Sequence, residues 1–183
     1  MKRIITVIIS LIYAATLHAS ETGQQPAIDA AWFKAHYVKN EYMIPMRDGI
    51  RLYTAVYTPK NRRSHHPILL TRTPYGCGPY GRRNASFWQQ AIFEDYLRAD
   101  YIIVFQDVRG RWRSEGEFVN IRPYVADKSS GAIDESSDTY DTVEWLLRKL
   151  KCHNGRVGVF GNSSSGFYAL MAAASGHPAI RAV

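Results

Sequence analysis

Along this chain, short apolar runs alternate with segments in which hydrophobic residues recur every three to four positions. This pattern predicts strands alternating with helices. The first clear stretch, residues 41–59 (EYMIPMRDGIRLYTAVYTP), contains Arg47-Asp48-Gly49, residue types that suit a tight hairpin turn. The strand expected after this turn carries the apolar positions Ile50, Leu52, Ala55 and Tyr57, and Pro59 ends it. We therefore predict that the stretch forms an antiparallel β-hairpin.

Downstream of the hairpin, short apolar runs alternate with longer amphipathic segments. Short runs flanked by turn residues predict strands, and apolar residues repeated every three to four positions predict helices. The predicted strands are residues 68–70, 101–110 and 156–160, and the predicted helices are 86–99 (with Ser86 as N-cap), 138–150 (ended by Asn154-Gly155) and 166–175. Residues 110–137 are expected to form a long polar loop. This alternation predicts a parallel sheet covered on both faces. With the opening hairpin, it indicates an α/β protein, the N-terminal part of an α/β-hydrolase fold.

The first residues have the order of a secretory signal peptide. Lys2 and Arg3 precede an apolar run, residues 4–17, and small residues follow at Ala19 and Ser20. The run is shorter than the roughly 20 residues that a membrane span needs, so an uncleaved anchor is the weaker alternative. We expect residues 1–19 to be the signal peptide of a secreted or periplasmic protein, with no stable membrane span after cleavage. Residues 20–40 are then an N-terminal linker, and residues 41–183 belong to the α/β domain.

The composition fits a single domain with a buried core, because 46% of the 183 residues are hydrophobic. The formal net charge is +7, but the basic residues are scattered along the chain. The positive charge is therefore interpreted as a solvated surface and not as a binding site for a polyanion, and no nucleic acid partner is expected. The chain has two cysteines, Cys77 and Cys152, and the sequence is equally compatible with a disulfide between them and with two free thiols. Neither cysteine lies in a CxxC or Cys/His cluster, so no metal and no cofactor are expected.

Three consecutive serines mark the junction between strand 156–160 and helix 166–175, in GVFGNSSSGFYAL. A nucleophilic serine at a strand-to-helix bend needs small neighbours, because the bend is strained and closely packed. Counting from Gly161 selects Ser163 and counting back from Gly166 selects Ser164, although neither completes the usual G-x-S-x-G. Ser163 is favoured, because Ser164 would put the bulkier Asn162 at the bend. A serine-rich loop without chemistry is the alternative reading of these residues alone.

Five segments, in the same order, resemble the α-amino acid ester hydrolases and, more broadly, the cocaine-esterase and Xaa-Pro dipeptidyl-peptidase superfamily of serine hydrolases. They are RDGIRLYTAVYTP, PILLTRTPYG, FQDVRGRWRSEGEFVNIRP, DESSDTYDTVEWL and NGRVGVFGNSSSGFYALMAAASGHPAIRAV. The family's elbow reads G-x-S-Y-x-G, a spacing that selects Ser163 as nucleophile. Ser164 stands where the family has tyrosine, and the resemblance implies that its backbone N–H is one oxyanion donor. The resemblance implies that the hydroxyl of Tyr75, in the R-T-P-Y segment, is the second.

The resemblance also implies an activity for the protein of which these residues form the N-terminal part. It implies an exported serine hydrolase that cleaves small-molecule acyl esters or amides, of the α-amino acid ester type, through an acyl-serine intermediate. It is also compatible with a homo-oligomeric full-length protein. The alternative is a catalytically incomplete remnant or a non-enzymatic binding protein.

The acid and base that a serine nucleophile needs are not expected within these residues. In this fold both follow the serine, but after Ser163 come no Asp or Glu and one histidine, His177. Fourteen residues of helix span roughly 21 Å, so His177, expected at the surface, lies too far from Ser163. We therefore expect the 183 residues alone to be inactive. Asp107 and Arg109 are expected to tie the long loop to the sheet rather than to bind substrate.

Overall fold

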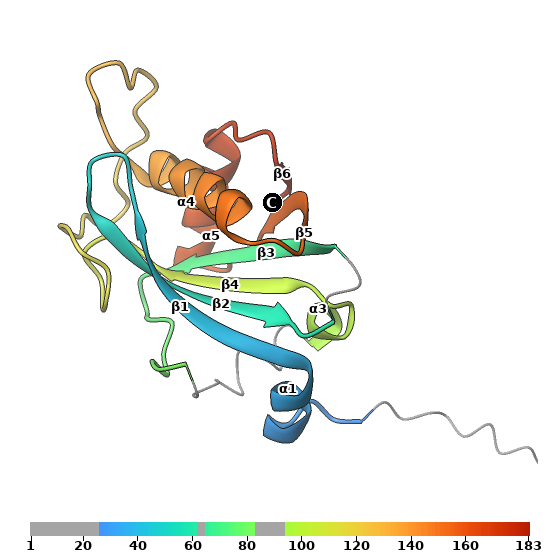
Figure 1. The fold of residues 1–183 in the computed structure, drawn as a ribbon. Coiled ribbons are helices and arrows are strands. Elements are labelled where there is room, and N and C mark those ends of the chain that lie inside the picture. Colours follow the sequence, from blue (N-terminus) through green and yellow to red (C-terminus); the bar gives the residue numbers. More distant parts are fainter. Residues whose placement is uncertain (1–25, 62–64, 83–93) are drawn as a thin grey trace, which may run out of the picture.

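A mixed six-stranded sheet forms the centre of the computed structural model, which describes residues 26–61, 65–82 and 94–183 (Figure 1). The strands are β1 (Tyr37–Pro45), β2 (Arg51–Pro59), β3 (His66–Thr73), β4 (Ile102–Asp107), β5 (His153–Val159) and β6 (Ile180–Ala182). Their order across the sheet is β1-β2-β4-β3-β5-β6. The expected signal peptide, residues 1–19, lies outside the described residues. Within the described ranges, no helix is both long enough and apolar enough to cross a membrane.

The opening hairpin is present as predicted. β1 and β2 pair antiparallel from Tyr37 opposite Pro59 to Pro45 opposite Arg51. The turn is closed by the Met46 N–H, which donates to Ile50 O at 2.8 Å, and Gly49 adopts a positive φ of 86° that glycine tolerates well. β1 begins four residues before the predicted stretch, inside the segment expected to be a linker.

The remaining strands confirm a mostly parallel sheet. β2 pairs antiparallel with β4, whereas the pairs β4–β3, β3–β5 and β5–β6 are all parallel. Every residue of β4 is buried, as its continuous apolar run predicts. The carboxyl ends of β3, β4 and β5 therefore meet along one edge of the sheet, where α/β proteins place their ligand sites.

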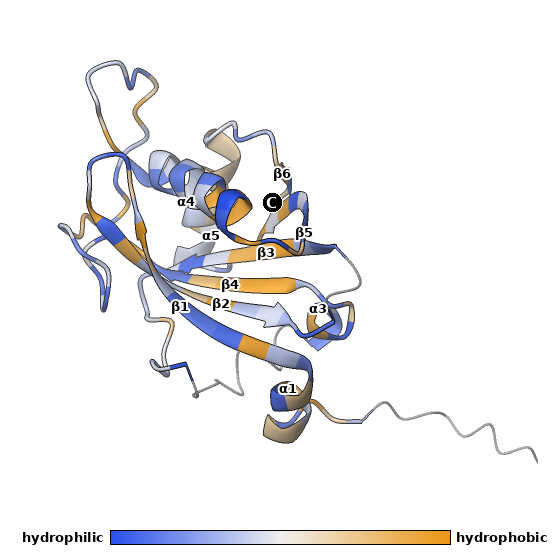
Figure 2. Cartoon of the chain, viewed as in Figure 1, coloured by the Kyte–Doolittle hydropathy of each residue, from blue (hydrophilic) through white to orange (hydrophobic). Residues whose placement is uncertain are grey.

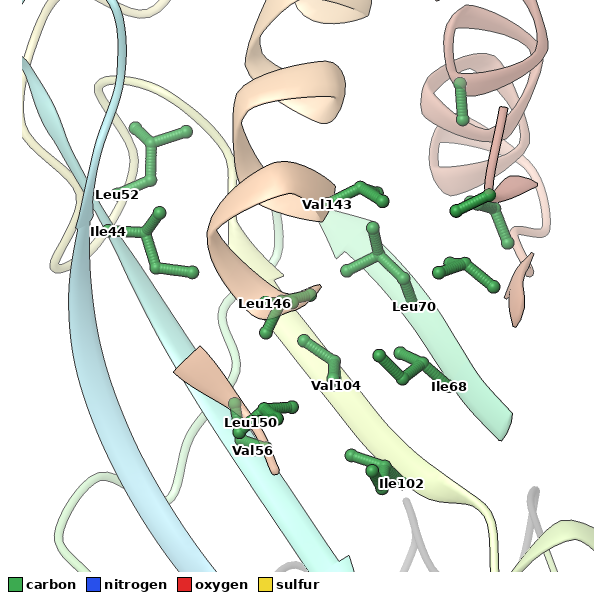
Figure 3. Close-up of a cluster of buried hydrophobic side chains, with 14 of the residues drawn as sticks. Ile44, Leu52, Val56, Ile68, Leu70, Ile102, Val104, Val143, Leu146 and Leu150 are labelled. Carbon is green, nitrogen blue, oxygen red and sulfur yellow. The ribbon is translucent and has the colours of Figure 1, made fainter. Parts of the chain in front are cut away.

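Helices lie on both faces of the sheet (Figure 1). α4 (Glu135–Lys149) and α5 (Ser164–Ala174) cover one face, and the shorter α1 (Ala30–His36) and α3 (Glu94–Arg98) lie on the other. Side chains alternate between the two faces along each strand, so Val104 belongs to the α4/α5 core and Phe105 to the α1/α3 core. Figure 2 shows the apolar residues gathered on the central strands β3 and β4. In Figure 3, Val143 and Leu146 of α4 and its C-cap residue Leu150 pack onto the sheet, as predicted.

Several element boundaries differ from the sequence prediction. α4 starts at Glu135, three residues early, because Asp134 caps it by accepting hydrogen bonds from the N–H groups of Ser136 and Ser137. Asn154 and Gly155 do not end this helix but lie inside β5. α3 coincides with the end of the predicted helix 86–99, whose residues 86–93 lie outside the described ranges. α1 and β6 were not predicted.

Candidate active site

Ser163 occupies a strained position at the turn between β5 and α5. Its backbone has φ 55° and ψ −124°, in a region that residues with a Cβ rarely adopt. It is the N-cap residue of α5, yet its side chain makes no capping hydrogen bond and is exposed. Such strain persists only where the surrounding structure enforces it, and it is typical of active-site residues. The turn therefore presents the Ser163 hydroxyl to solvent at the carboxyl edge of the sheet.

Gly161 has no room for a side chain, which explains the first glycine of the motif. A Cβ at this position would lie 2.0 Å from Ser165 O and 2.3 Å from Ser165 C, both backbone atoms. Gly166, the second glycine of the motif, is different, because a Cβ there would lie 3.6 Å from Gly161 O, an ordinary contact. The absence of a Cβ at Gly161 thus allows the chain to approach the first turn of α5 closely at the bend that holds Ser163.

The first turn of α5 leaves a backbone donor available beside Ser163. The N–H groups of Ser165 and Gly166 donate to Asn162 O at 3.0 Å and Ser163 O at 2.9 Å. Within the described residues, Ser164 N–H makes no corresponding bond to the carbonyl three residues earlier. The first N–H groups of a helix point outward and carry the positive end of its dipole, so they stabilise negative charge. Ser164 N–H is therefore suited to bind an oxyanion that forms next to Ser163.

Tyr75 reaches the same turn from the neighbouring strand. It follows the carboxyl end of β3, which lies beside β5 in the sheet, so residues far apart in sequence meet here. The hydroxyl oxygen of Tyr75 lies 2.8 Å from Ser164 Oγ, a hydrogen bond in which either can donate. The Tyr75 side chain is otherwise open, since the residue is 66% exposed. The structure thus brings two of the three predicted site residues into contact, and Ser163 is adjacent to one of them in the chain.

A buried ion-pair network lies under this edge of the sheet. Arg72 of β3 is fully buried; its Nη2 lies 3.1 Å from Glu135 Oε2, and its Nε donates to Gln106 Oε1 at 2.8 Å. Its guanidinium carbon also lies 5.7 Å from the centre of the Tyr168 ring in α5. Burial is the main effect on Glu135 and raises the pKa of its carboxyl above the ordinary value. Arg72 thus links the strand that precedes Tyr75 to both α4 and the elbow helix α5.

Arg109 joins the same network from the loop after β4. Its guanidinium bonds Asp138 of α4 at 2.7 Å and Asp48 of the hairpin turn at 2.6 Å. Burial would raise the pKa of Asp48, but hydrogen bonds and charge from Arg109 lower it below its ordinary value. The structure confirms that this arginine ties elements together.

Asp107 is also a structural residue, as predicted. Its carboxylate accepts hydrogen bonds from Cys77 N–H at 2.7 Å and the Tyr80 hydroxyl at 3.0 Å, and its backbone carbonyl accepts one from Ser114 Oγ at 2.6 Å. These bonds tie the loop after β3 and the long polar loop to the end of β4. Asp107 is fully buried and contributes no group to the surface around Ser163.

His177 is buried, so its expected place at the surface was wrong. Its Nε2 lies 2.9 Å from Glu144 Oε1 in α4, and its Nδ1 accepts from Ala179 N–H at 3.1 Å. The Tyr140 ring packs against the imidazole at 4.6 Å between centroids. Glu144 of α4 and the Ala179 N–H supply the polar contacts that let the imidazole leave water. His177 follows the far end of α5 and is engaged there, away from the Ser163 turn.

Cys77 and Cys152 are free thiols in the structure. Cys77 is fully buried, and burial raises the pKa of its thiol well above the ordinary value. Among the described residues, no cluster of three or more His, Cys, Asp or Glu side chains is arranged to hold a metal ion.

Comparison with known proteins supports the resemblance seen in the sequence. Residues 48–183 match the family described as X-Pro dipeptidyl-peptidase (S15 family). Cocaine esterase from Rhodococcus sp. (strain MB1 Bresler) is 36% identical over 148 residues, which cover 80% of this chain and 23% of that protein.

Two solved structures are similar as well, each with a TM-score of 0.72. One is an aminopeptidase from the marine sediment archaeon Thaumarchaeota archaeon, 39% identical over 87% of this chain and 26% of its own. The other is an α-amino acid ester hydrolase, 37% identical over 92% of this chain and 28% of its own. The chain thus spans about a quarter of the length of these relatives. The comparisons confirm the expected family and the α/β-hydrolase-like fold.

Proposed function

This chain belongs to the X-Pro dipeptidyl-peptidase (S15) family, and on that premise we propose that Ser163 is the nucleophile of an ester- or amide-cleaving hydrolase. The observation that carries this proposal is the strained backbone of Ser163, with φ 55°, at an exposed strand-to-helix turn. The steric requirement for Gly161 supports it, because a residue with a Cβ would not fit in the closely packed turn beside Ser163.

The proposed reaction has two stages. Ser163 Oγ attacks the substrate carbonyl carbon as its proton passes to a general base, and the carbonyl oxygen becomes an oxyanion. Ser164 N–H and the Tyr75 hydroxyl donate to this oxyanion. Collapse expels the alcohol or amine, which takes up the proton, and leaves an acyl group on Ser163. Water then attacks the acyl carbon, which releases the carboxylic acid and restores the serine.

The general base is proposed to come from outside the residues described here. Four of the described histidines stand at or next to the amino ends of strands, on the edge of the sheet opposite Ser163: His36 at β1, His65 and His66 at β3, and His153 at β5. A ring nitrogen of His36, His66 and His153 is hydrogen-bonded to a backbone carbonyl, and His177 is bonded to Glu144. We therefore expect the 183 residues alone to turn over substrate far more slowly than the protein expressed from its complete gene.

The proposed substrates are small α-amino acyl esters or amides. The names of two relatives, an aminopeptidase and an α-amino acid ester hydrolase, point to acyl groups with an α-amino group. Residues 1–19 have the pattern of a signal peptide, so we propose that the protein acts after export. Residues 37–183, from the start of β1, would form the N-terminal portion of the catalytic domain.

Kinetics of the protein expressed from its complete gene test the proposal. Alanine 4-nitroanilide and 4-nitrophenyl acetate serve as amide and ester probes, and Ser163→Ala is compared with Ser165→Ala. Ser163→Ala should lower kcat/KM by at least about 10⁴-fold, because alanine has no oxygen with which to attack the substrate carbonyl. Ser165→Ala should stay within about 3-fold of wild type, because Ser165 is assigned no part in the reaction and alanine suits a helix. Wild-type rates in Ser163→Ala would overturn the assignment.

A further inference from the structure

The hydrogen bond between Tyr75 and Ser164 connects a loop to the first residue of a helix. Ser164 opens α5, so its backbone is fixed by the helix and its side chain has one rotatable bond to the hydroxyl. Its Oγ lies 2.8 Å from the Tyr75 hydroxyl oxygen. A short side chain on a rigid element holds its partner in place more firmly than a long side chain on a loop.

The backbone of Tyr75 is well anchored. Its N–H donates to Thr73 Oγ1 at 3.1 Å, and the preceding carbonyl, Pro74 O, accepts from Arg111 Nε at 3.1 Å and Trp112 Nε1 at 3.0 Å. The ring is not anchored in the same way, because the residue is 66% exposed and little packing restricts its rotamer. Within the described part of the chain, Ser164 Oγ is the partner that the structure gives to the ring's hydroxyl. The position of the hydroxyl therefore depends on Ser164.

The direction of this bond decides what Tyr75 can do. A hydroxyl has one proton to donate and two lone pairs that accept. When Ser164 donates to the Tyr75 oxygen, the Tyr75 proton is free to point at a third atom. A chain of hydrogen bonds in one direction also strengthens each donor along it.

We propose that the Ser164 hydroxyl is a positioning group that donates to Tyr75 and holds the Tyr75 proton toward the oxyanion. This inference rests on the proposed function. Ser164 then serves the reaction twice: its backbone N–H donates to the oxyanion directly, and its side chain acts through Tyr75. Ser163 and Ser165, its neighbours in the triplet, have different roles, the first as nucleophile and the second as a small helix residue.

A double-mutant cycle on the protein expressed from its complete gene tests this role, with 4-nitrophenyl acetate as the probe. Ser164→Ala removes the hydroxyl but keeps the N–H, and it should lower kcat by about 3- to 10-fold with little change in KM, the range expected for one neutral hydrogen bond. In a Tyr75→Phe background the same change should have no further effect, because the group it positions is already gone. Ser164→Thr, which keeps a hydroxyl, should recover most of the activity, and Ser165→Ala is the matched control. Circular dichroism spectra confirm that each variant is folded.

Three results would overturn the inference while leaving the proposed function standing. They are an unchanged kcat in Ser164→Ala, an equal loss in the wild-type and Tyr75→Phe backgrounds, and no recovery in Ser164→Thr. Failure of the proposed function is distinct, because it would appear as retained activity in Ser163→Ala.

Discussion

Replacing Gly161 by alanine adds one methyl group where the backbone leaves no space. The new Cβ would lie 2.0 Å from Ser165 O, 2.3 Å from Ser165 C and 2.8 Å from Gly166 N. These are backbone atoms of the first turn of α5, so no side-chain rotation relieves the clash. Real Cβ atoms essentially never lie closer than 3.0 Å to such an atom. To reach this distance, the turn and the helix must separate by about 1 Å.

This separation would move Ser163 and the Ser164 N–H, the groups that the proposed reaction uses. Overpacking of this kind costs about 1–3 kcal/mol of unfolding free energy. A shift of about 1 Å at Ser163 and Ser164 N–H misaligns the nucleophile and the oxyanion donor, and such misplacement costs about 100-fold in rate. We therefore predict that Gly161→Ala lowers kcat about 100-fold or more and lowers the melting temperature.

Gly166→Ala is the matched control, because Gly166 lies inside α5, three residues after Ser163. Its Cβ would lie 3.6 Å from Gly161 O, an ordinary contact, and alanine is favoured over glycine within a helix by about 1 kcal/mol. This variant should keep its activity and be as stable as the wild type or more so. The assays are steady-state hydrolysis of 4-nitrophenyl acetate and a thermal melt. Equal activity and stability in the two alanine variants would refute the steric account of the elbow.

Three further predictions concern the fold around the site. Arg72→Met leaves the buried Glu135 carboxylate without its paired cation, whereas Asp138 keeps Arg109, so urea titration should show a loss of about 3–5 kcal/mol of unfolding free energy. Arg51→Met, at an exposed pair, should change the unfolding free energy little, and equal effects of the two substitutions would contradict the network's role. Burial acts to raise the pKa of Asp134, but its backbone and side-chain hydrogen bonds lower it from 3.8 to about 2, so its stabilising contribution is present above pH ~4 and is lost as the pH falls toward 2. Asp134→Asn should therefore flatten the decline of stability between pH 4 and 2, and an unchanged slope in melting temperature would count against the assignment. Ellman's reagent should titrate the partly exposed Cys152 in the native protein and Cys77 only after denaturation, and no reactive thiol in either state would indicate a disulfide.

Hydrophobic spacing predicted most of the fold because strands and helices here bury continuous apolar surfaces. The hairpin turn at Asp48-Gly49 and the apolar run of β4 are local signals that the tertiary structure does not override. α1 buries only Phe33, and β6 has three residues, so neither carries a pattern long enough to detect. The start of α4 was missed because its first residues are polar yet buried, which depends on partners elsewhere in the chain.

The site was predictable where it depends on residues adjacent in sequence. The small neighbours of Ser163 and the elbow spacing of the family that the sequence resembles favour Ser163 as the nucleophile, and the strained Ser163 backbone agrees with that expectation. The contact between Tyr75 and Ser164 could not be predicted, because it depends on β3 and β5 lying side by side. The resemblance implies a role for the backbone N–H of Ser164, and the structure adds a contact of its side chain.

Long-range polar partners explain the remaining differences. Arg72 appeared in the sequence only as part of the segment that contains Tyr75, although it is the centre of a buried network with Gln106 and Glu135. The polar character of His177 suggested exposure, whereas Glu144 from another helix supplies the partner that allows burial. A single sequence does not show such pairs, since their members lie 33 to 63 positions apart.

The identity of the nucleophile is tested most directly by covalent labelling with a fluorophosphonate. Ser163 Oγ would displace fluoride from phosphorus, forming one P–O bond as its proton passes to the base. Incubation of the protein expressed from its complete gene should add one probe per chain, and fragmentation of tryptic peptide 157–181, which holds all three serines, should place it on Ser163. The label should be absent from Ser163→Ala and present in Ser165→Ala. A label on Ser164 or Ser165, or a label that persists in Ser163→Ala, would contradict the account.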